Sequence, residues 1–259
     1  MARSPRSICT ACWCTGAGKS TLLSLLKPEI APTGECTGEL RVLGENVADM
    51  DVRASAERVG YVFQDPENQI VCETVWHEMA FGLENLGMSR DEMRRRVAET
   101  SYFFGMEDWL HRDTDTLSGG RKQLLSLAAV LALRPRVLLL DEPLSALDAK
   151  VRVQLRDQIR RIQLTTGTTT VFVTHDQEEA LAVADRIGVM NKGKIEQIAA
   201  PQDLYQRPPP STWPRSLDSP TVCPAPPTAR RRWSSASAYR CSPVPPKGIP
   251  WPCSCARRI

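Results

Sequence analysis

TGAGKST, which is Thr15-Gly16-Ala17-Gly18-Lys19-Ser20-Thr21, is the stretch that decides the fold. Gly16 and Gly18 have no Cβ, so the backbone can turn tightly and direct its N–H groups at an anion. A helix that follows adds the partial positive charge of its N-terminus. In this pattern Lys19 reaches the β- and γ-phosphates of a nucleotide, and the hydroxyl of Ser20 holds Mg²⁺. The stretch therefore predicts a phosphate-binding loop.

One residue departs from the phosphate-loop pattern G-x-x-x-x-G-K-S/T. The pattern has a glycine five residues before Gly18, and this chain has Trp13 there. If the backbone at that position needs a positive φ, a bulky residue costs about 1–3 kcal/mol. We therefore expect Trp13 to impair the loop.

Strands and helices alternate after the loop, which predicts an α/β fold with a mainly parallel sheet. Apolar or alternating runs predict strands at Glu39–Leu43, Arg58–Phe63, Val137–Leu140, Thr168–Thr174, Asp185–Met190 and Lys194–Ile198. Apolar residues three or four apart predict helices at Leu22–Leu26, Val75–Leu86, Leu124–Leu133, Ala149–Leu164 and Gln177–Ala184, and one that Ser89 opens as a capping box.

Polar side chains stand at the predicted carboxyl ends of three strands, where open parallel sheets bind their ligands. Asp141 and Glu142 follow the apolar run Val137–Leu140, while Gln64 and His175 follow two other strands. Asp141 suits the water shell of Mg²⁺, and Glu142 suits a general base that polarises the attacking water. His175 suits a hydrogen bond to the γ-phosphate or to that water, and Gln64 completes the metal or water site. Together with the loop they predict phosphoryl-transfer chemistry.

Each of these groups has a structural interpretation when it is taken alone. Asp141-Glu142-Pro143 is typical of a turn after a strand, and Ser118-Gly119-Gly120 is typical of a turn. A single histidine such as His175 is more often a satisfied surface or core residue. Only their order and spacing together favour a function.

Six stretches in this order make the chain similar to the nucleotide-binding subunit of an ATP-binding cassette (ABC) transporter. They are the Walker A loop Gly16–Thr21, the Q-loop Gln64, the signature Leu117–Arg121, the Walker B strand Val137–Glu142, the D-loop Ser145–Asp148 and the switch histidine His175. The resemblance covers about residues 15–207. It implies a P-loop NTPase fold, with a RecA-like core and a helical subdomain at about 72–125.

The resemblance implies an ATPase with ATP and Mg²⁺ as cofactors, in which Glu142, His175 and Gln64 serve catalysis. The residues that would bind nucleotide are Thr15, Gly16, Ala17, Gly18, Lys19, Ser20, Thr21, Asp141, Ser118, Gly119, Gly120 and Asp148. Those that would hold Mg²⁺ are Ser20, Gln64 and Asp141. In a head-to-tail dimer, Ser118 and Gly120 would serve the nucleotide of the partner subunit.

The resemblance also implies partners. They are a second ABC ATPase subunit, identical or different, transmembrane permease subunits and a solute-binding component, at the cytoplasmic face of the cell membrane. Gln64 and the helical subdomain would pass motion to the permease. The stretch Tyr61–Glu142 resembles ATPases of energy-coupling-factor importers, whereas Leu144–Pro208 resembles those of polyamine and sugar importers. Both halves indicate import.

Two alternatives stay open. One is a catalytically impaired or truncated ABC nucleotide-binding module, and the other is a soluble ABC ATPase that serves no transport. The family places antiparallel strands and an adenine-stacking aromatic residue before the loop, and we expect both to be largely missing here. By analogy with base–aromatic stacking, losing the aromatic residue weakens nucleotide binding by about 1–3 kcal/mol.

Composition and charge narrow the classes of function that remain. The formal net charge of +3 comes from the basic segment 208–259, so no nucleic-acid partner is indicated. Cys9, Cys12 and Cys14 resemble a metal knuckle, but no His/Cys set at zinc spacing accompanies them. The longest apolar run, Leu124–Leu133, is too short to span a bilayer. We expect residues 1–14 to be irregular and the proline-rich segment 208–259 to be a disordered tail.

Overall fold

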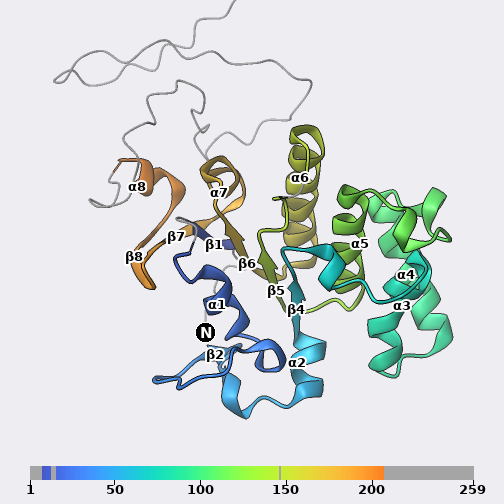
Figure 1. Cartoon of the computed structure of the whole chain (residues 1–259), viewed down its shortest axis with the longest axis horizontal. Helices are drawn as coiled ribbons and strands as arrows, with labels where there is room; N and C mark the ends of the chain where they lie inside the picture. Colours follow the sequence, from blue (N-terminus) through green and yellow to red (C-terminus); the bar gives the residue numbers. More distant parts are fainter. Residues whose placement is uncertain (1–7, 13–15, 146, 207–259) are drawn as a thin grey trace, which may run out of the picture.

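Six strands form one sheet in the computed structural model, which describes residues 8–12, 16–145 and 147–206 (Figure 1). The strand order is β4-β5-β6-β1-β7-β8, and all neighbours are parallel except β7 and β8. The strands are β1 (Ile8–Cys12), β4 (Val59–Val62), β5 (Val137–Asp141), β6 (Thr169–Thr174), β7 (Arg186–Asn191) and β8 (Lys194–Ala199). The two short strands β2 (Arg41–Val42) and β3 (Glu45–Asn46) pair separately. The predicted α/β fold with a mainly parallel sheet is confirmed.

The strand β1 corrects our expectation that residues 1–14 are irregular. Residues Ile8–Cys12 pair in parallel with β6 on one side and with β7 on the other. A five-residue strand shows too little of a period to be recognised, and here the pairing of its backbone on both sides defines it. The other residues of that expectation, 1–7 and 13–14, lie outside the described ranges.

Helices cover both faces of the sheet, because alternate side chains of the central strands point to opposite sides. In β5, Leu138 and Leu140 pack in the same cluster as residues of α5 (Gly119–Ala132) and α6 (Ala149–Thr166). Val137 and Leu139 belong to a second cluster, with Leu23 of α1 (Lys19–Ser24) and residues near α2 (Val52–Arg58). This two-sided burial explains why residues 137–140 form a continuous apolar run.

The helices α3 (Val75–Asn85) and α4 (Arg90–Phe104) lie to one side of the sheet and pack against α5 (Figure 1). The hydroxyls of Thr74 and Ser89 accept hydrogen bonds from backbone N–H groups of the first turns of α3 and α4, so Thr74 caps α3 and the predicted cap at Ser89 is confirmed. Since α5 also packs on β4, the helices and the sheet share one hydrophobic cluster. The predicted limits of the helical subdomain, 72–125, stay a prediction.

Several element limits differ from the predicted ones. α1 begins at Lys19 and α5 at Gly119, earlier than expected, because glycine and polar residues are tolerated in a first helical turn. The strand expected at Glu39–Leu43 is reduced to β2. The helices α2, α7 (Gln177–Val183) and α8 (Pro201–Gln206) complete the described part, and α2 and α8 are absent from the sequence prediction. The expected tail, 208–259, lies outside the described residues.

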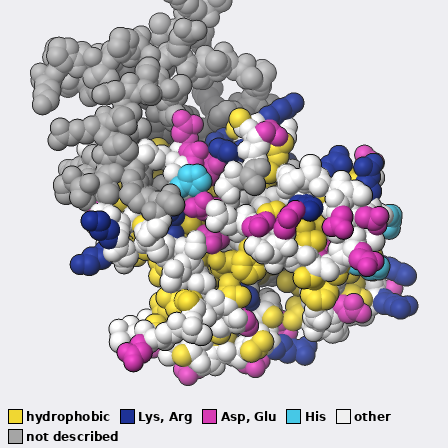
Figure 2. Space-filling view, in the orientation of Figure 1, with side chains coloured by type: hydrophobic (Ala, Val, Ile, Leu, Met, Phe, Trp, Pro, Cys, Tyr) yellow, Lys and Arg dark blue, Asp and Glu magenta, His cyan; other side chains and the backbone are white. Residues whose placement is uncertain are grey.

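None of the helices within the described ranges combines the length and the hydropathy that crossing a bilayer requires. Figure 2 shows charged side chains of both signs on the side of the molecule that α3, α4 and α5 form.

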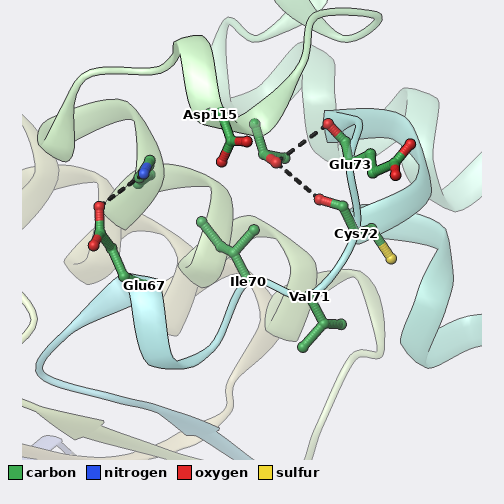
Figure 3. A pocket seen from close by; sticks show the side chains of 8 residues that line it. Glu67, Ile70, Val71, Cys72, Glu73 and Asp115 are labelled. Atoms are coloured by element: carbon green, nitrogen blue, oxygen red, sulfur yellow. Dashed lines mark hydrogen bonds and ion pairs between the residues drawn. The ribbon is translucent and has the colours of Figure 1, made fainter.

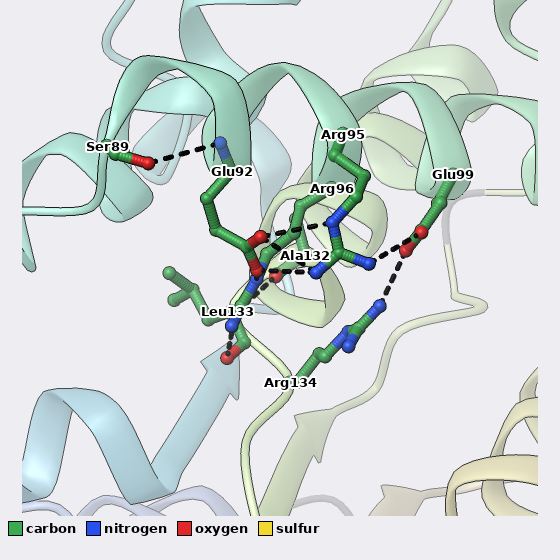
Figure 4. A network of polar contacts seen from close by, with 8 residues as sticks. All are labelled: Ser89, Glu92, Arg95, Arg96, Glu99, Ala132, Leu133 and Arg134. Atoms are coloured by element: carbon green, nitrogen blue, oxygen red, sulfur yellow. Dashed lines mark hydrogen bonds and ion pairs between the residues drawn. The ribbon is translucent and has the colours of Figure 1, made fainter.

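A polar network fastens α4 to the end of α5 (Figure 4). Arg96 on α4 donates from Nη1 to the carbonyl oxygens of Ala132 and Leu133, at 3.3 and 3.2 Å, and from Nε to Glu92 at 2.7 Å. The last carbonyls of a helix have no partner within the helix, so Arg96 satisfies two of them. Among the described residues, Arg95 pairs only with the acidic side chains Glu92 and Glu99 of its own helix, and it is half-exposed.

We predict that Arg96→Met destabilises the protein by about 1.5–3 kcal/mol, because hydrogen bonds from a charged donor to backbone carbonyl groups contribute about that much. Arg95→Met, one residue away on the same helix, should change the free energy of unfolding much less, since exposed ion pairs contribute little. Urea denaturation of both variants measures the difference. Equal losses for the two variants would contradict the prediction.

Candidate functional site

Four loops meet at one edge of the sheet and line a pocket of about 510 Å³. They follow the carboxyl ends of β1, β4, β5 and β6, which lie together because these strands are parallel. The residues that line the pocket are Gly16, Gly18, Lys19, Ser20, Thr21, Gln64, Glu142 and His175. The structure therefore brings together most of the residues predicted for the site.

The loop before α1 has the backbone that an anion-binding loop needs. Gly16 and Gly18 have φ angles of 80° and 86°, in the region that favours glycine, and Gly18 is the N-cap of α1. Gly193, in the turn between β7 and β8, donates its N–H to the carbonyl oxygen of Ala17 at 3.1 Å. The sequence alone did not predict this hydrogen bond, because the two residues are far apart in the chain. Trp13 and Thr15, which we also predicted to matter, lie outside the described residues.

Lys19 places a buried positive charge in the pocket. Its side chain is 4% exposed, and its Nζ lies 4.0 Å from Oε1 of Glu142. A buried ammonium group is tolerated only with acidic or anionic partners. The position therefore suits the binding of a phosphate group.

Ser20 and Asp141 present two oxygens side by side. Oγ of Ser20 donates to Oδ1 of Asp141 at 3.0 Å, and the hydroxyl of Tyr61 donates to Oδ2 at 3.3 Å. Burial raises the pKa of Asp141, although these hydrogen bonds oppose the shift. Burial and the neighbouring Asp141 also raise the pKa of Tyr61, which keeps the phenol protonated as a donor. Tyr61 is a contact that sequence reasoning missed, because β4 and β5 are distant in the chain.

These oxygens fit Mg²⁺ bound together with nucleotide phosphates. Magnesium in such sites takes one or two protein oxygens and completes its shell with phosphate and water. No group of three or more His, Cys, Asp or Glu side chains in the described part could hold a metal ion by itself, and this mode of binding needs none. Gln64 donates from Nε2 to Oε2 of Glu142 at 3.3 Å, so its predicted contact with Mg²⁺ stays a prediction.

Glu142 is the centre of the polar contacts in the pocket. Its Oε2 lies 2.8 Å from Nδ1 of His175 and also accepts from Gln64. Its backbone has a φ of 44°, and its N–H donates to the carbonyl oxygen of Val173 at 3.0 Å, which joins the ends of β5 and β6. An ionised carboxylate only accepts hydrogen bonds, so Nδ1 of His175 is then the donor and Nε2 is left for another group. The arrangement suits a base with an oriented histidine beside it.

The predicted residues Ser118, Gly120 and Asp148 lie in a different pocket, of about 770 Å³ between α5 and α6. This pocket shares no lining residue with the first one. Asp148 is the N-cap of α6 and accepts from the N–H groups of Lys150 and Val151. Gly119 follows Ser118 at the start of α5, with open space where a Cβ would be. The role of these residues toward a partner's nucleotide stays a prediction.

A third pocket, of about 450 Å³, lies beside the segment that follows Gln64 (Figure 3). Its lining residues are Glu67, Ile70, Val71, Cys72, Glu73, Thr114, Asp115 and Lys122. Lys122 on α5 pairs with Glu67 at 2.8 Å, and the hydroxyl of Thr114 donates to the carbonyl oxygens of Cys72 and Glu73. The pocket thus lies where the segment after β4 meets the helices.

A family model described as "ABC transporter" matches residues 14–145 of the chain. The energy-coupling factor transporter ATP-binding protein EcfA1 of Streptococcus pneumoniae is 41% identical over 192 residues, which are 74% of this chain and 68% of that protein. The sn-glycerol-3-phosphate import ATP-binding protein UgpC of Chromohalobacter salexigens is 43% identical over 198 residues, 75% of this chain and 51% of that protein.

Among solved structures, CbiO1 from Clostridium perfringens, part of the ABC transporter complex cbiONQ, matches with a TM-score of 0.71 and 27% identity. The match covers 80% of this chain and 82% of that one. The chain spans 34% of the length of the first curated relatives it matches, which come from Bacillus species.

We predict that Asp141→Asn raises the melting temperature of the ligand-free protein at pH 7. The pKa of Asp141 is raised in the folded state, so its stability contribution is full below the pKa of the unfolded chain and is lost as the pH rises through the folded value. A neutral side chain removes this loss, and the difference between variant and wild type should shrink toward pH 4. Thermal unfolding across this range measures it, with the exposed Asp157→Asn as control. A lower melting temperature of Asp141→Asn at pH 7 would refute the raised pKa of Asp141.

Proposed function

Because the chain belongs to the ABC transporter family of ATP-binding proteins, we propose that it binds and hydrolyses ATP with Mg²⁺ and thereby energises solute import through a separate permease. One observation carries this proposal. Lys19, Ser20, Asp141, Glu142 and His175 converge at one edge of the sheet, with the glycine loop beside them. The family membership that the motifs predict is confirmed. ATP hydrolysis coupled to import is what we propose.

The residues of the pocket divide the work between binding and chemistry. The loop 16–21 and the N-terminus of α1 bind the phosphates, and Lys19 neutralises part of their charge. Ser20 and Asp141 hold Mg²⁺, which, when bound, offsets the charge that develops on the phosphate oxygens. Glu142 accepts a proton from the attacking water, and His175 orients Glu142 through the 2.8 Å contact.

A second ABC ATPase subunit completes the site in this proposal. Ser118 and Gly120 lie in a pocket apart from the phosphate loop of their own chain. If these residues bind nucleotide, the nucleotide must lie in the pocket of another copy, because they do not line the phosphate pocket of their own chain. We therefore propose a head-to-tail pair, made of two identical or two related chains.

We propose that the permease contacts lie at the third pocket, because it is beside the Gln64 segment (Figure 3). Movement of Gln64 on hydrolysis would reach this pocket directly along the chain. The relatives named as an import ATP-binding protein and as an energy-coupling factor transporter ATP-binding protein support import. The position at the cytoplasmic face of the membrane and the solute-binding component are part of the proposal. They also favour transport over a soluble ABC ATPase.

We predict that Glu142→Gln lowers the rate of ATP hydrolysis by about 10²–10⁴-fold, the usual contribution of a general base, while ATP binding is kept. Glu84→Gln, on the exposed side of α3, should leave both unchanged. Steady-state hydrolysis and calorimetric titration of ATP with and without Mg²⁺ measure the two properties. A wild-type chain with no Mg²⁺-dependent affinity at millimolar ATP would sink the proposed function.

We predict that Trp13→Gly tightens ATP binding about tenfold, because it restores the glycine of the loop pattern, and a bulky residue costs ~1–3 kcal/mol where the pattern requires a positive φ. Fluorescence titration with a labelled nucleotide compares the variant with the wild type. The same titration of Trp76→Phe, on α3, controls for the loss of a tryptophan signal. Unchanged affinity would show that the position tolerates tryptophan, which argues against the impaired module.

A further inference from the structure

Glu179 is a buried carboxylate that the phosphate pocket does not use. It lies in the first turn of α7 and is 6% exposed. Its Oε2 accepts from the hydroxyl of Thr174 at 2.6 Å, and its Oε1 lies 3.6 Å from Nε of Arg152. Burial raises the pKa of its carboxyl, and these two contacts oppose the shift. A buried carboxylate with such specific partners calls for an explanation.

The hydroxyl of Thr174 joins the residues on both sides of His175. It donates to Glu179 and accepts from the N–H of Asp176 at 3.0 Å. Thr174 comes directly before His175 and Asp176 directly after it. One buried oxygen therefore fixes the backbone that carries the histidine.

Arg152 connects this arrangement to the turn that follows Glu142. From Nη2 it donates to the carbonyl oxygen of Leu147 at 3.0 Å, and its Nη1 lies 3.7 Å from Oδ2 of Asp176. The same turn holds Glu142, because Ser145 donates from N and Oγ to the carbonyl oxygen of Glu142, at 3.1 and 2.9 Å. Glu142 and His175, the two partners of the 2.8 Å contact, are thus held by one network of hydrogen bonds and ion pairs, which serves as a frame for both.

The ring of His175 needs such a frame, because 54% of its side chain is exposed and packing does not fix it. We propose that Thr174, with Glu179 and Arg152, is a positioning residue that holds His175 against Glu142. The catalytic meaning of this contact rests on the proposed function, but the contact itself does not depend on ATP. A misplacement of about 1 Å at a reacting group costs as much as 10²-fold in rate.

The kinetic test compares three substitutions on β6. Thr174→Val removes the hydroxyl and keeps the branched shape, and Thr174→Ser keeps the hydroxyl. Thr170→Val is the matched control, because Thr170 lies on the same face of the same strand and its buried hydroxyl has no hydrogen-bond partner among the described residues. We expect Thr174→Val to lower kcat about tenfold or more with KM changed less than about twofold, and the other two to match the wild type.

A second measurement does not need activity. The chain has three histidines, so the ring signals can be resolved by NMR and the signal of His175 identified from its loss in His175→Gln. Glu142→Gln should shift that signal in the wild-type background and in Thr170→Val. In the Thr174→Val background the same change should have little effect, because the ring no longer lies against Glu142.

The outcomes separate the two ideas. If Thr174→Val behaves like Thr170→Val in the NMR measurement, the positioning role is overturned, whatever the kinetics show. If the wild type hydrolyses no ATP, the proposed function fails, while the NMR comparison still decides the positioning role. Should circular dichroism show Thr174→Val to be unfolded, Glu179→Gln replaces it with the same expected losses. The exposed neighbour Glu178→Gln is then the control.

Discussion

Parallel pairing of β1, β4, β5 and β6 is the constraint on which the site depends, because it brings four carboxyl ends to one edge of the sheet. Each end contributes a different chemical group, and in an antiparallel arrangement of the same strands the ends of neighbouring strands would lie at opposite edges, so the four groups could not all meet. The direct backbone bond from Glu142 to Val173 extends this pairing one residue beyond β5. The ladder of the sheet thus continues into the loop that carries Glu142.

The pocket also shows how buried charged side chains are stabilised. Lys19 and Glu142 lie 4.0 Å apart, while Asp141 is held by two hydroxyl groups rather than by a cation. These internal contacts are what the ligand-free site offers to its charged groups, and an anionic ligand and a divalent cation that enter together would add opposite charges to it.

Much of the site could be predicted because its residues follow strands directly. Asp141 and Glu142 stand after an apolar run, so their place at the sheet edge is a local property of the sequence. The hydrogen bond of Tyr61 to Asp141 and the tie of Gly193 to Ala17 join segments distant in the chain, and no local pattern carries that information. For the same reason β1 could not be predicted, since its neighbours in the sheet define it.

The position of β1 between β6 and β7 has a consequence for the way the chain is made. β1, the first strand of the described part, must wait for residues 169–191, because both of its partners are synthesised near the end of that part. Until then the middle of the sheet is incomplete, and unpaired strand edges and apolar side chains are exposed to other nascent chains. Contacts of such long sequence separation fold slowly. Chaperones would therefore bind the nascent chain mainly before residues 169–191 have been synthesised.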